Sequence, residues 1–411
     1  MNQPFTGQLG NRLIALLDSS DYHTLNIVVA FAKNSGVLRI IGSLEKFRNQ
    51  GGKVNIYVGV DLGGTSYEAL TALLLHTDSL YVVHSEKRQT FHSKIYHFLG
   101  DEKELIAVGS HNLTAGGLWT NFESSIIVPL DTSCDNKNQI VNDVKVYISE
   151  LHSLKDSFMP ITTQDDIDKL LNNGYVFNEV SEQVSRRKAA NQNGSRESLF
   201  GNGVKANLPL TDSRKKEQTE VTSEVPSESG SVTPSELSSQ EDEDQVIWLE
   251  TRKLTGGSRN ILDLSMKSLI ERGNPRGTSF DLSNPKFMRG GVEFFGLNPS
   301  SFDETKNITI NFEGVDYLNN TILFPVGRNP NGTWRLQVKG VSASGKKITE
   351  AFRDKSDAHY LVNKIVTFTK VQDDYYFMSV FPETMLNEFE DASSILARNG
   401  STRGAKRLGL L

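Results

Sequence analysis

The sequence predicts an α/β N-terminal domain, with a mixed sheet covered by helices on both faces, followed by an all-β pseudobarrel domain. Residues 12–76 alternate between helix-like and strand-like hydrophobic patterns, which is typical of a sheet with helices on both faces. After residue 246 the apolar residues fall in short, closely spaced strand-like runs, which favours a barrel or pseudobarrel. We therefore expect a first domain over 1–179, a flexible acidic linker over 180–245 and a second domain over 246–411.

The first elements alternate regularly between helix and strand. Residues 24–32 and 53–60 are continuous apolar runs, as expected for strands buried on both faces. Around them we expect helices over 12–20, 36–52 and 67–76, and a loop over 61–66. Ligands bind at strand ends in such sheets, so this loop could line a crevice. For Asp61 itself, an ordinary strand-to-helix turn is the favoured interpretation.

The segment that follows is dominated by strands. We expect them over 79–86, 90–98, 105–112 and 122–130, with a tight turn at 99–104. Two helices then complete the first domain, over 135–158 and 162–174, and Thr163 is the expected N-cap of the second.

Composition indicates a soluble globular protein of the cytoplasm. The 411 residues are enough for two or three domains, and a hydrophobic content of 37% is ordinary. The apolar run over 25–32 is too short to span a membrane, and the N-terminus lacks the pattern of a signal peptide. The one cysteine, Cys134, excludes an intrachain disulfide and a cysteine-rich zinc site.

The negative charge is concentrated in the expected linker. Residues 217–244 contain nine acidic and no basic side chains, whereas the whole chain has a net charge of −6. The rest of the chain therefore carries a net charge of +3. Mildly basic folded domains are compatible with DNA binding, although one basic patch matters more than the total.

Five polar residues between positions 92 and 123 form the candidate active site. His92 and Lys94 are two residues apart in an expected strand, so their side chains should project from the same face. Ser110 and Asn112 lie in a Gly-Ser-x-Asn turn at the end of the next strand, and Glu123 follows. Imidazole can attack phosphorus, and lysine, serine and asparagine can donate to the phosphate oxygens. The set therefore favours phosphoryl chemistry.

This spacing resembles the phospholipase D superfamily, especially its small nucleases and the NgoFVII-type restriction endonucleases. The resemblance implies that His92 attacks phosphorus to give a phosphohistidine, or protonates the leaving oxygen. It also implies that Lys94, Ser110 and Asn112 hold the phosphate while Glu123 orients the histidine. In the superfamily's longer signature an aspartate stands where this chain has Leu99, which leaves open the group that supports the lysine.

The remaining histidines sharpen this assignment. An isolated His-x-Lys pair would be interpreted as a packed histidine beside a solvated lysine, but Ser110, Asn112 and Glu123 favour the catalytic interpretation. We expect His97 and His111 to be bystanders. The superfamily's chemistry uses two His-x-Lys motifs, and no other histidine here has a lysine two residues later. The resemblance therefore predicts a homodimer with a shared active site.

The second half contains the run NGTWRLQVKG and, before it, the loops GSRN and NPRG, together with short strands at close spacing. With these features it resembles the plant-transcription-factor-type pseudobarrel of BfiI- and NgoAVII-type restriction endonucleases. Arginine and asparagine can bond in pairs to guanine and adenine in the major groove of double-stranded DNA. Three loops or strands supply such residues, and the candidate DNA-binding residues are Arg259, Asn260, Arg276, Arg328, Asn329, Asn331, Trp334 and Arg335.

Together these features predict a sequence-specific DNA endonuclease of a restriction system that requires no divalent metal, because no cluster of metal-ligand spacing accompanies the motif. The alternatives are a nuclease subunit that depends on a separate ATPase, a phosphodiesterase for another substrate, and an inactive DNA-binding protein. The chain has no phosphate-binding loop, so ATP would enter only through a partner ATPase or helicase. A cognate DNA methyltransferase is a further expected partner, and no membrane contact is expected.

Overall fold

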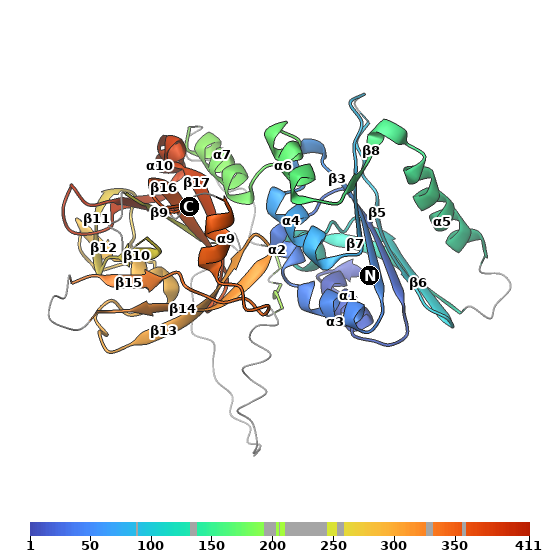
Figure 1. Ribbon diagram of the computed structural model, residues 1–411, viewed down its shortest axis with the longest axis horizontal. Helices are drawn as coiled ribbons and strands as arrows, with labels where there is room; N and C mark the ends of the chain where they lie inside the picture. The colour runs from blue at the N-terminus through green and yellow to red at the C-terminus, as the bar shows by residue number, and fades with distance from the viewer. Residues whose placement is uncertain are drawn as a thin grey trace, which may run out of the picture. The chain divides into compact units, whose positions relative to one another are not determined.

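The computed structural model describes residues 1–87, 89–131, 138–192, 203–204, 206–209, 245–252, 259–325, 332–355 and 359–411. The chain divides into two compact units (Figure 1). Unit 1 comprises Met1–Gln183 and Ser195–Thr211, and unit 2 comprises Val184–Gly194 and Asp212–Leu411.

Unit 1 is built on a mixed sheet of eight strands in the order β1-β7-β6-β5-β2-β3-β4-β8. The strands β2, β3 and β4 run parallel to one another, and every other neighbouring pair is antiparallel. This confirms the predicted mixed sheet. The strands are β1 (Asn2–Gln3), β2 (Thr24–Val29), β3 (Lys53–Gly59), β4 (Ser79–Val83), β5 (Lys94–Leu99), β6 (Lys103–Gly109), β7 (Glu123–Asp131) and β8 (Phe158–Ile161).

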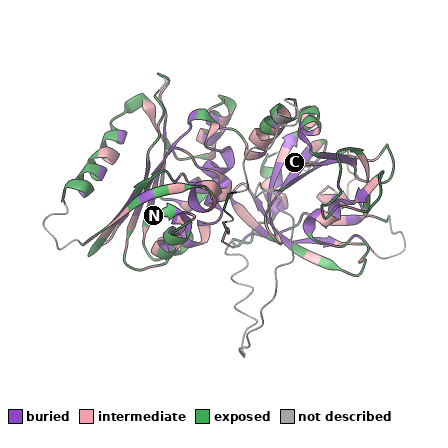
Figure 2. Cartoon of the chain, turned by 180° about the vertical axis from the view of Figure 1, so that it is seen from behind, coloured by how far each residue is buried: buried purple, intermediate pink, exposed green. Residues whose placement is uncertain are grey.

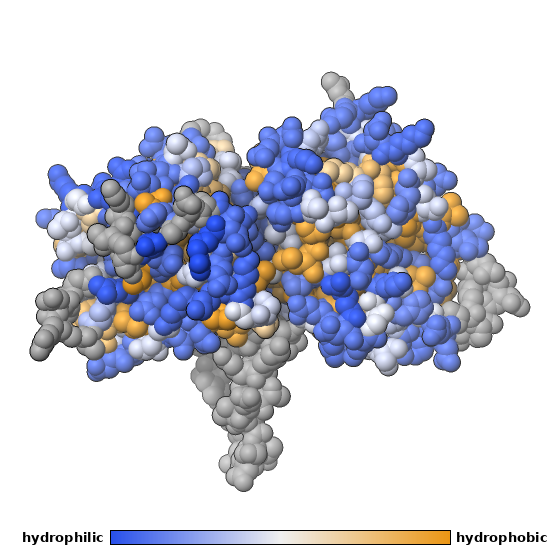
Figure 3. All heavy atoms as spheres, in the orientation of Figure 1, coloured by the Kyte–Doolittle hydropathy of each residue, from blue (hydrophilic) through white to orange (hydrophobic). Residues whose placement is uncertain are grey.

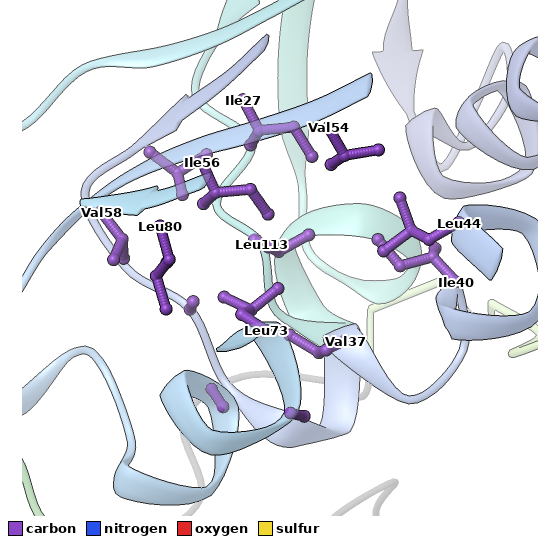
Figure 4. Close-up of a cluster of buried hydrophobic side chains, with 14 of the residues drawn as sticks. Ile27, Val37, Ile40, Leu44, Val54, Ile56, Val58, Leu73, Leu80 and Leu113 are labelled. Carbon is purple, nitrogen blue, oxygen red and sulfur yellow. The ribbon is translucent and has the colours of Figure 1, made fainter. Parts of the chain in front are cut away.

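Helices cover both faces of this sheet, as the alternating pattern predicts. On one face, side chains from the sheet pack with the helices α1, α3, α4 and α6 in the main core. Figure 4 shows a part of this core, with Ile56 of β3 near Leu73 of α4. On the other face α5 packs against the sheet through Val141, Val144 and Leu151 (Figure 1). The helical elements are α1 (Leu9–Leu17), α2 (Asn34–Val37), α3 (Ile41–Asn49), η1 (Asp61–Gly63), α4 (Tyr67–His76), η2 (Gly116–Thr120), α5 (Asn138–His152), η4 (Lys155–Ser157), α6 (Gln164–Asn172) and α7 (Glu179–Gln192).

Two helices expected in unit 1 are interrupted or shorter in the structure. The helix expected over 36–52 is two helices, α2 and α3, because the chain turns after Val37. The helix expected to continue to residue 158 ends at His152, and Phe158 begins the edge strand β8, which pairs with β4. Phe158 stacks on Tyr81 with ring centroids 4.8 Å apart, so side-chain packing holds this short strand in place.

The expected linker begins with a helix rather than a flexible segment. Within α7, Val180 and Val184 are buried. The start of α7 is fixed by Glu179, whose backbone N–H donates to Glu68 Oε2 at 3.1 Å and whose carboxylate accepts from Ser66 Oγ at 3.0 Å. Further on, Asn207 accepts a hydrogen bond from the side chain of Gln8, and the neighbouring Leu208 packs on the core of unit 1. Part of the linker therefore docks on unit 1.

Unit 2 contains an eleven-stranded sheet in the order β10-β15-β14-β13-β17-β16-β9-β19-β18-β11-β12. All neighbours are antiparallel except β13 and β17. Its strands are β9 (Val246–Glu250), β10 (Ile261–Leu264), β11 (Lys267–Arg272), β12 (Phe287–Arg289), β13 (Thr305–Phe312), β14 (Val315–Leu323), β15 (Trp334–Gln337), β16 (Lys364–Gln372), β17 (Tyr375–Pro382), β18 (Ile395–Arg398) and β19 (Arg407–Leu410).

The predicted β character of the second half is confirmed, with helical additions that the sequence analysis did not predict. These are η5 (Gly291–Phe295), α9 (Ile348–Lys355), η6 (Glu383–Met385) and α10 (Leu386–Ala392). Phe352 of α9 and Phe389 of α10 are buried, so each helix packs through an aromatic side chain. The buried residues of this unit lie mainly on its strands (Figure 2).

Hydrophilic residues cover most of the face seen in Figure 3, with hydrophobic patches between them on both units. Within the described ranges, no helix is both long and apolar enough to cross a bilayer.

Candidate active site

The candidate catalytic residues lie at one end of the unit 1 sheet. Lys94 is the first residue of β5, Ser110 follows the last residue of β6, and Glu123 is the first residue of β7. Because β5, β6 and β7 are antiparallel neighbours, these three positions meet at the same edge. The Ser110 N–H donates to the Ser124 carbonyl at 3.0 Å, which continues the ladder into the turn.

The turn after β6 requires glycine at position 109. A Cβ at Gly109 would lie 2.2 Å from the Ser124 carbonyl oxygen, so any side chain would push β7 away from β6. The glycine of the Gly-Ser-x-Asn motif therefore brings Ser110 close to the start of β7 and to Glu123.

His92 precedes β5, so the alternation of a strand does not place it beside Lys94 as the sequence analysis expected. The two residues meet because the Lys94 side chain turns back. Lys94 Nζ lies 2.8 Å from His92 Nδ1 and donates to the His92 carbonyl at 2.9 Å. His92 itself is exposed, and its ring meets the Phe31 ring edge-on with centroids 6.0 Å apart.

Lys94 is only 6% exposed, although the histidine beside it is open to solvent. Burial lowers the pKa of Lys94 because water no longer solvates the ammonium, and the negative charge of Glu123 acts in the opposite direction. The ammonium therefore lies in a partly dry place where it would interact strongly with an anion.

Glu123 forms hydrogen bonds with two neighbours at this end of the sheet. It accepts a hydrogen bond from the Ser110 hydroxyl and a second one from Asn121 Nδ2 at 3.3 Å. The resemblance implied that Glu123 orients His92, but in this structure Lys94 makes the contact with His92 Nδ1 instead. Glu123 thus acts on the site through Ser110 and through its charge near Lys94.

Asn112 is held by the strand on the other side of β5. Its Oδ1 accepts from the Phe31 N–H at 3.2 Å, just beyond the end of β2. Because the amide oxygen is engaged by the backbone, the Nδ2 group is the part of Asn112 that could donate to a ligand.

Asp61 is a site residue for which the sequence analysis favoured an ordinary turn. Its side chain is 9% exposed, its Oδ1 lies 2.8 Å from His84 Nδ1, and its Oδ2 accepts from the Phe91 N–H at 2.9 Å. Phe91 directly precedes His92, so Asp61 holds the backbone that presents the candidate nucleophile. The signal available in the sequence was an aspartate after a buried strand, at the end where ligands bind.

The two histidines expected to be bystanders are buried away from these contacts. His97 is fully buried with Nε2 3.6 Å from Glu104 Oε2, and His111 Nδ1 donates to the Gly117 carbonyl at 2.8 Å. Burial lowers the pKa of both imidazoles because the charged form loses its solvation.

The aspartate missing from the longer signature is not replaced by a near neighbour in sequence. Leu99 ends β5, about 16 Å from Lys94 at the usual rise of a strand. Asp101 is 98% exposed and lies 3.7 Å from His23 Nε2, beyond that same end. Glu123 is therefore the carboxylate whose charge supports Lys94.

The chain was compared with known proteins. No protein-family model matches it, and neither does any curated protein. Among solved structures, it is similar to Nuc of Salmonella typhimurium, a phospholipase D family member, at 14% identity over 39% of this chain and 95% of that chain, with a TM-score of 0.29. NucT of Helicobacter pylori gives 14% identity, 39% and 96% coverage, and a TM-score of 0.28.

Polyphosphate kinase of Porphyromonas gingivalis gives 13% identity over 37% of this chain, with a TM-score of 0.24. This chain spans only 21% of the length of that kinase.

The candidate DNA-binding residues of unit 2 are scattered. Arg259 and Asn260 lie in the turn before β10, and Arg276 is exposed in the loop after β11. Arg335 is partly exposed on β15, where it pairs with Asp263 of β10 in the sheet register. Arg328, Asn329 and Asn331 lie outside the described residues.

Trp334 is a correction to the predicted DNA-binding set. It is fully buried, and its indole N–H donates to the Pro299 carbonyl at 3.1 Å. It packs edge-on against Phe324 in the core of unit 2. The side chain therefore has no surface to offer DNA, because β15 directs Trp334 inward and Arg335 outward.

Metal ligands do not gather in the part of the chain that the structure describes. No group of three or more His, Cys, Asp or Glu side chains there could hold a metal ion.

Proposed function

We propose that this protein is a phosphodiesterase that cleaves DNA through a covalent phosphohistidine at His92. The observation that supports the proposal best is the meeting of Lys94, Ser110 and Glu123 at the end of three neighbouring strands, with His92 on Lys94. The ammonium, the hydroxyl and the Asn112 amide offer donors to a phosphate, and the exposed imidazole offers a nucleophile.

The contact between Lys94 and His92 bears on which role the histidine takes. An ammonium that donates to Nδ1 requires the lone pair there, so a neutral imidazole in this arrangement carries its proton on Nε2. That tautomer has no lone pair on Nε2 and cannot attack phosphorus, and it is not the acid either, because loss of its one ring proton would leave an imidazolate. The acid is the imidazolium, which carries a proton on both nitrogens, so Lys94 does not donate to Nδ1 in that state. For attack, the lone pair must be on Nε2, so Lys94 turns from the imidazole to a phosphate oxygen and Nδ1 takes up the proton.

The proposed reaction has two displacement steps. In the first, Nε2 of one His92 forms a bond to phosphorus and the bond from phosphorus to the leaving oxygen breaks. The imidazolium of a second His92 gives its Nε2 proton to that oxygen and becomes neutral. In the second, water attacks the phosphohistidine, the N–P bond breaks, and the second His92 takes the proton from the water. Lys94 and the neutral hydrogen-bond donors can stabilise the negative charge on the phosphate oxygens, which a metal ion does in other phosphodiesterases. We therefore propose that cleavage is metal-independent.

The second histidine in this scheme comes from a second copy of the chain. Val108 and Ile126 lie opposite each other on β6 and β7, next to the turns that carry Ser110 and Glu123. Phe122 stacks on Phe5 with ring centroids 5.6 Å apart at the same edge. These four apolar side chains are 45–72% exposed. Exposed apolar side chains near a half-site support a two-fold contact that pairs the motifs.

Unit 2 is proposed as the DNA-recognition domain, a pseudobarrel whose exposed Arg276 and partly exposed Arg335 contact bases or phosphates. A restriction role follows if recognition is sequence-specific. Dependence on a separate ATPase is the alternative within this proposal.

The test is cleavage of plasmid DNA by the purified chain in excess EDTA, compared with His92→Ala. We expect full activity of the wild type and loss of activity in the variant. His23→Ala is the matched control, because His23 is an exposed histidine near the far end of β5. Cleavage that stops in EDTA and returns with magnesium would refute metal independence. A wild type that hydrolyses a phosphatidylcholine analogue but no DNA would refute the nuclease proposal.

A further inference from the structure

A cavity in unit 2 has a composition that suits a nucleotide. It has a volume of about 610 Å³, within the range of small-molecule pockets, which is roughly 300–1,000 Å³. Three cationic side chains, two carboxamides and two aromatic rings line it, and its described lining contains no acidic side chain. We call it the basic cavity, and its lining includes Arg259, Asn260, Gln337, Lys339, Arg353 and Tyr360.

The elements that enclose the basic cavity are fixed to one another. The Val338 N–H donates to the Asn260 carbonyl at 2.9 Å, which ties the turn before β10 to the end of β15. On the opposite side, Phe352 of α9 is buried and stacks on Tyr360, with ring centroids 5.3 Å apart and an angle of 26° between the planes. The cavity lining therefore combines polar groups with a stacked pair of aromatic rings.

Two of the cations have no carboxylate partner among the residues described. Lys339 is exposed and donates to Gln337 Oε1 at 2.9 Å, and Arg353 donates to the Thr349 carbonyl one turn earlier in α9. Lys355, in the same last turn of α9, instead pairs with Glu313 at 2.6 Å. Lys339 and Arg353 therefore place positive charge in the cavity lining, where no described carboxylate pairs with them.

We propose that the basic cavity binds a nucleotide, with its phosphate on Lys339 and Arg353 and its base against Tyr360. Cations match the phosphate charge, an aromatic ring can stack on any base, and the carboxamides of Asn260 and Gln337 can each donate and accept on a base edge. The nucleotide is either part of bound DNA or a free mononucleotide. The first source rests on the proposed function of unit 2, and the second does not.

The experiment uses the full chain and two probes. Fluorescence anisotropy measures binding of a labelled DNA duplex across a salt series, and calorimetry measures binding of deoxyadenosine monophosphate. The variants are Lys339→Ala with Arg353→Ala, which removes both cations proposed to hold the phosphate, and Tyr360→Leu, which removes the stacking surface. Lys355→Ala is the matched control, because it removes a cation from the same helix turn outside the cavity.

If the nucleotide belongs to DNA, the double variant lowers the slope of log affinity against log salt by about 2, roughly one for each cation that no longer neutralises a phosphate. Tyr360→Leu then weakens duplex binding by about tenfold and leaves the slope unchanged, because stacking releases no counterions. If the nucleotide is free, the variants abolish binding of the monophosphate and leave the duplex slope unchanged.

The proposal is overturned if the variants match Lys355→Ala with both probes, or if the wild type binds neither. These results are distinguishable from failure of the proposed function, which is measured separately as plasmid cleavage. If the chain binds the monophosphate in the basic cavity but cuts no DNA, nucleotide binding is supported and the nuclease proposal is refuted.

Discussion

The two units of the molecule differ in how their candidate functional residues are organised. In unit 1 the ends of three hydrogen-bonded strands bring Lys94, Ser110 and Glu123 together, and each residue has a described partner in the site. In unit 2 the described candidates come from the turn before β10, the loop after β11 and the strand β15, and Trp334 belongs to the core. The residues chosen by motif spacing meet at one end of a sheet, whereas the donors chosen by residue type come from several different elements.

The difference has a physical cause. Antiparallel strands of nearly equal length return the chain to the same sheet edge, so residues about fifteen positions apart meet there. Loops of a large sheet have no such constraint, and their polar residues are common for reasons of solubility alone.

The largest effect is expected at His92. The His92→Ala protein should lose at least about 10³-fold in cleavage rate, by analogy with the loss of a catalytic nucleophile. Mixing wild-type chains with an excess of the variant under subunit exchange should lower activity well below the dilution value, because most dimers would then lack one of two required histidines. Activity that tracks the wild-type fraction, together with a monomeric mass, would rule out the shared site.

Trp334 should affect stability and not recognition. Replacing a fully buried tryptophan by alanine leaves a cavity, so Trp334→Ala should lower the free energy of unfolding by about 3–5 kcal/mol. Urea denaturation measures this, and Arg335→Ala is the control, expected within about 0.5 kcal/mol of the wild type because its side chain is on the surface. An unchanged free energy of unfolding together with weakened DNA binding would indicate that Trp334 contacts DNA, as the sequence predicted.

Arg335 should show the opposite behaviour. If its guanidinium contacts a base in two places, Arg335→Ala weakens specific DNA binding by about 1–3 kcal/mol. Arg328→Ala should do the same if Arg328 also contacts a base. The measurement is the ratio of specific to non-specific affinity at one salt concentration. Arg403→Ala, at an exposed position near the C-terminus, is the control. An equal loss of affinity for specific and non-specific DNA would indicate that Arg335 contacts a phosphate instead.

The sequence predicted the sheet of unit 1 well because its strands are continuous or alternating apolar runs. It missed β8, a four-residue edge strand that contains a proline and depends on ring stacking for its place. The burial of Trp334 was within reach, since Trp334, Leu336 and Val338 alternate with polar residues and all three are buried. The alternation of apolar and polar residues therefore predicts which side chains of this strand are buried, whereas its composition is typical of a loop.

Within the site, spacing located all five motif residues but not their pairing. That Lys94 turns back to His92, and that Glu123 bonds Ser110, depends on where β5 begins and on the register of β6 and β7. The role of Asp61 depends on a contact with Phe91, thirty positions away, which no local pattern encodes.

Asp61 offers a finer test of how unit 1 organises its site. Asp61→Asn keeps the shape but replaces the charge-assisted hydrogen bond from the Phe91 N–H by a weaker neutral one. We therefore expect kcat to fall by about tenfold with little change in KM, since the backbone before His92 is held less firmly while every phosphate donor stays in place. Asp78→Asn is the matched control, because Asp78 also accepts from a backbone N–H, that of Val54, at the other end of the sheet. An equal loss in both variants would indicate a general effect on folding.

The smallest effect is expected in the response of the two units to acid. Seven of the eight histidines precede residue 184, and His359 is the one in unit 2. Burial lowers the pKa of His97 and His111 below the ordinary value of 6.5. The unfolded chain therefore binds more protons than the folded one between the folded pKa and 6.5, so stability rises with pH in that window and is lost as pH falls below about 6.5.

Hydrogen exchange, followed separately for the peptides of each unit, should show unit 1 opening first as the pH is lowered, with little change in unit 2 over the same range. His97→Gln removes one of the two buried imidazoles and should flatten the dependence in unit 1, whereas His23→Gln, at an exposed histidine, should leave it unchanged. Equal opening of both units would show that acid acts through carboxylates common to them, and the contrast in buried histidines would then have no part in stability.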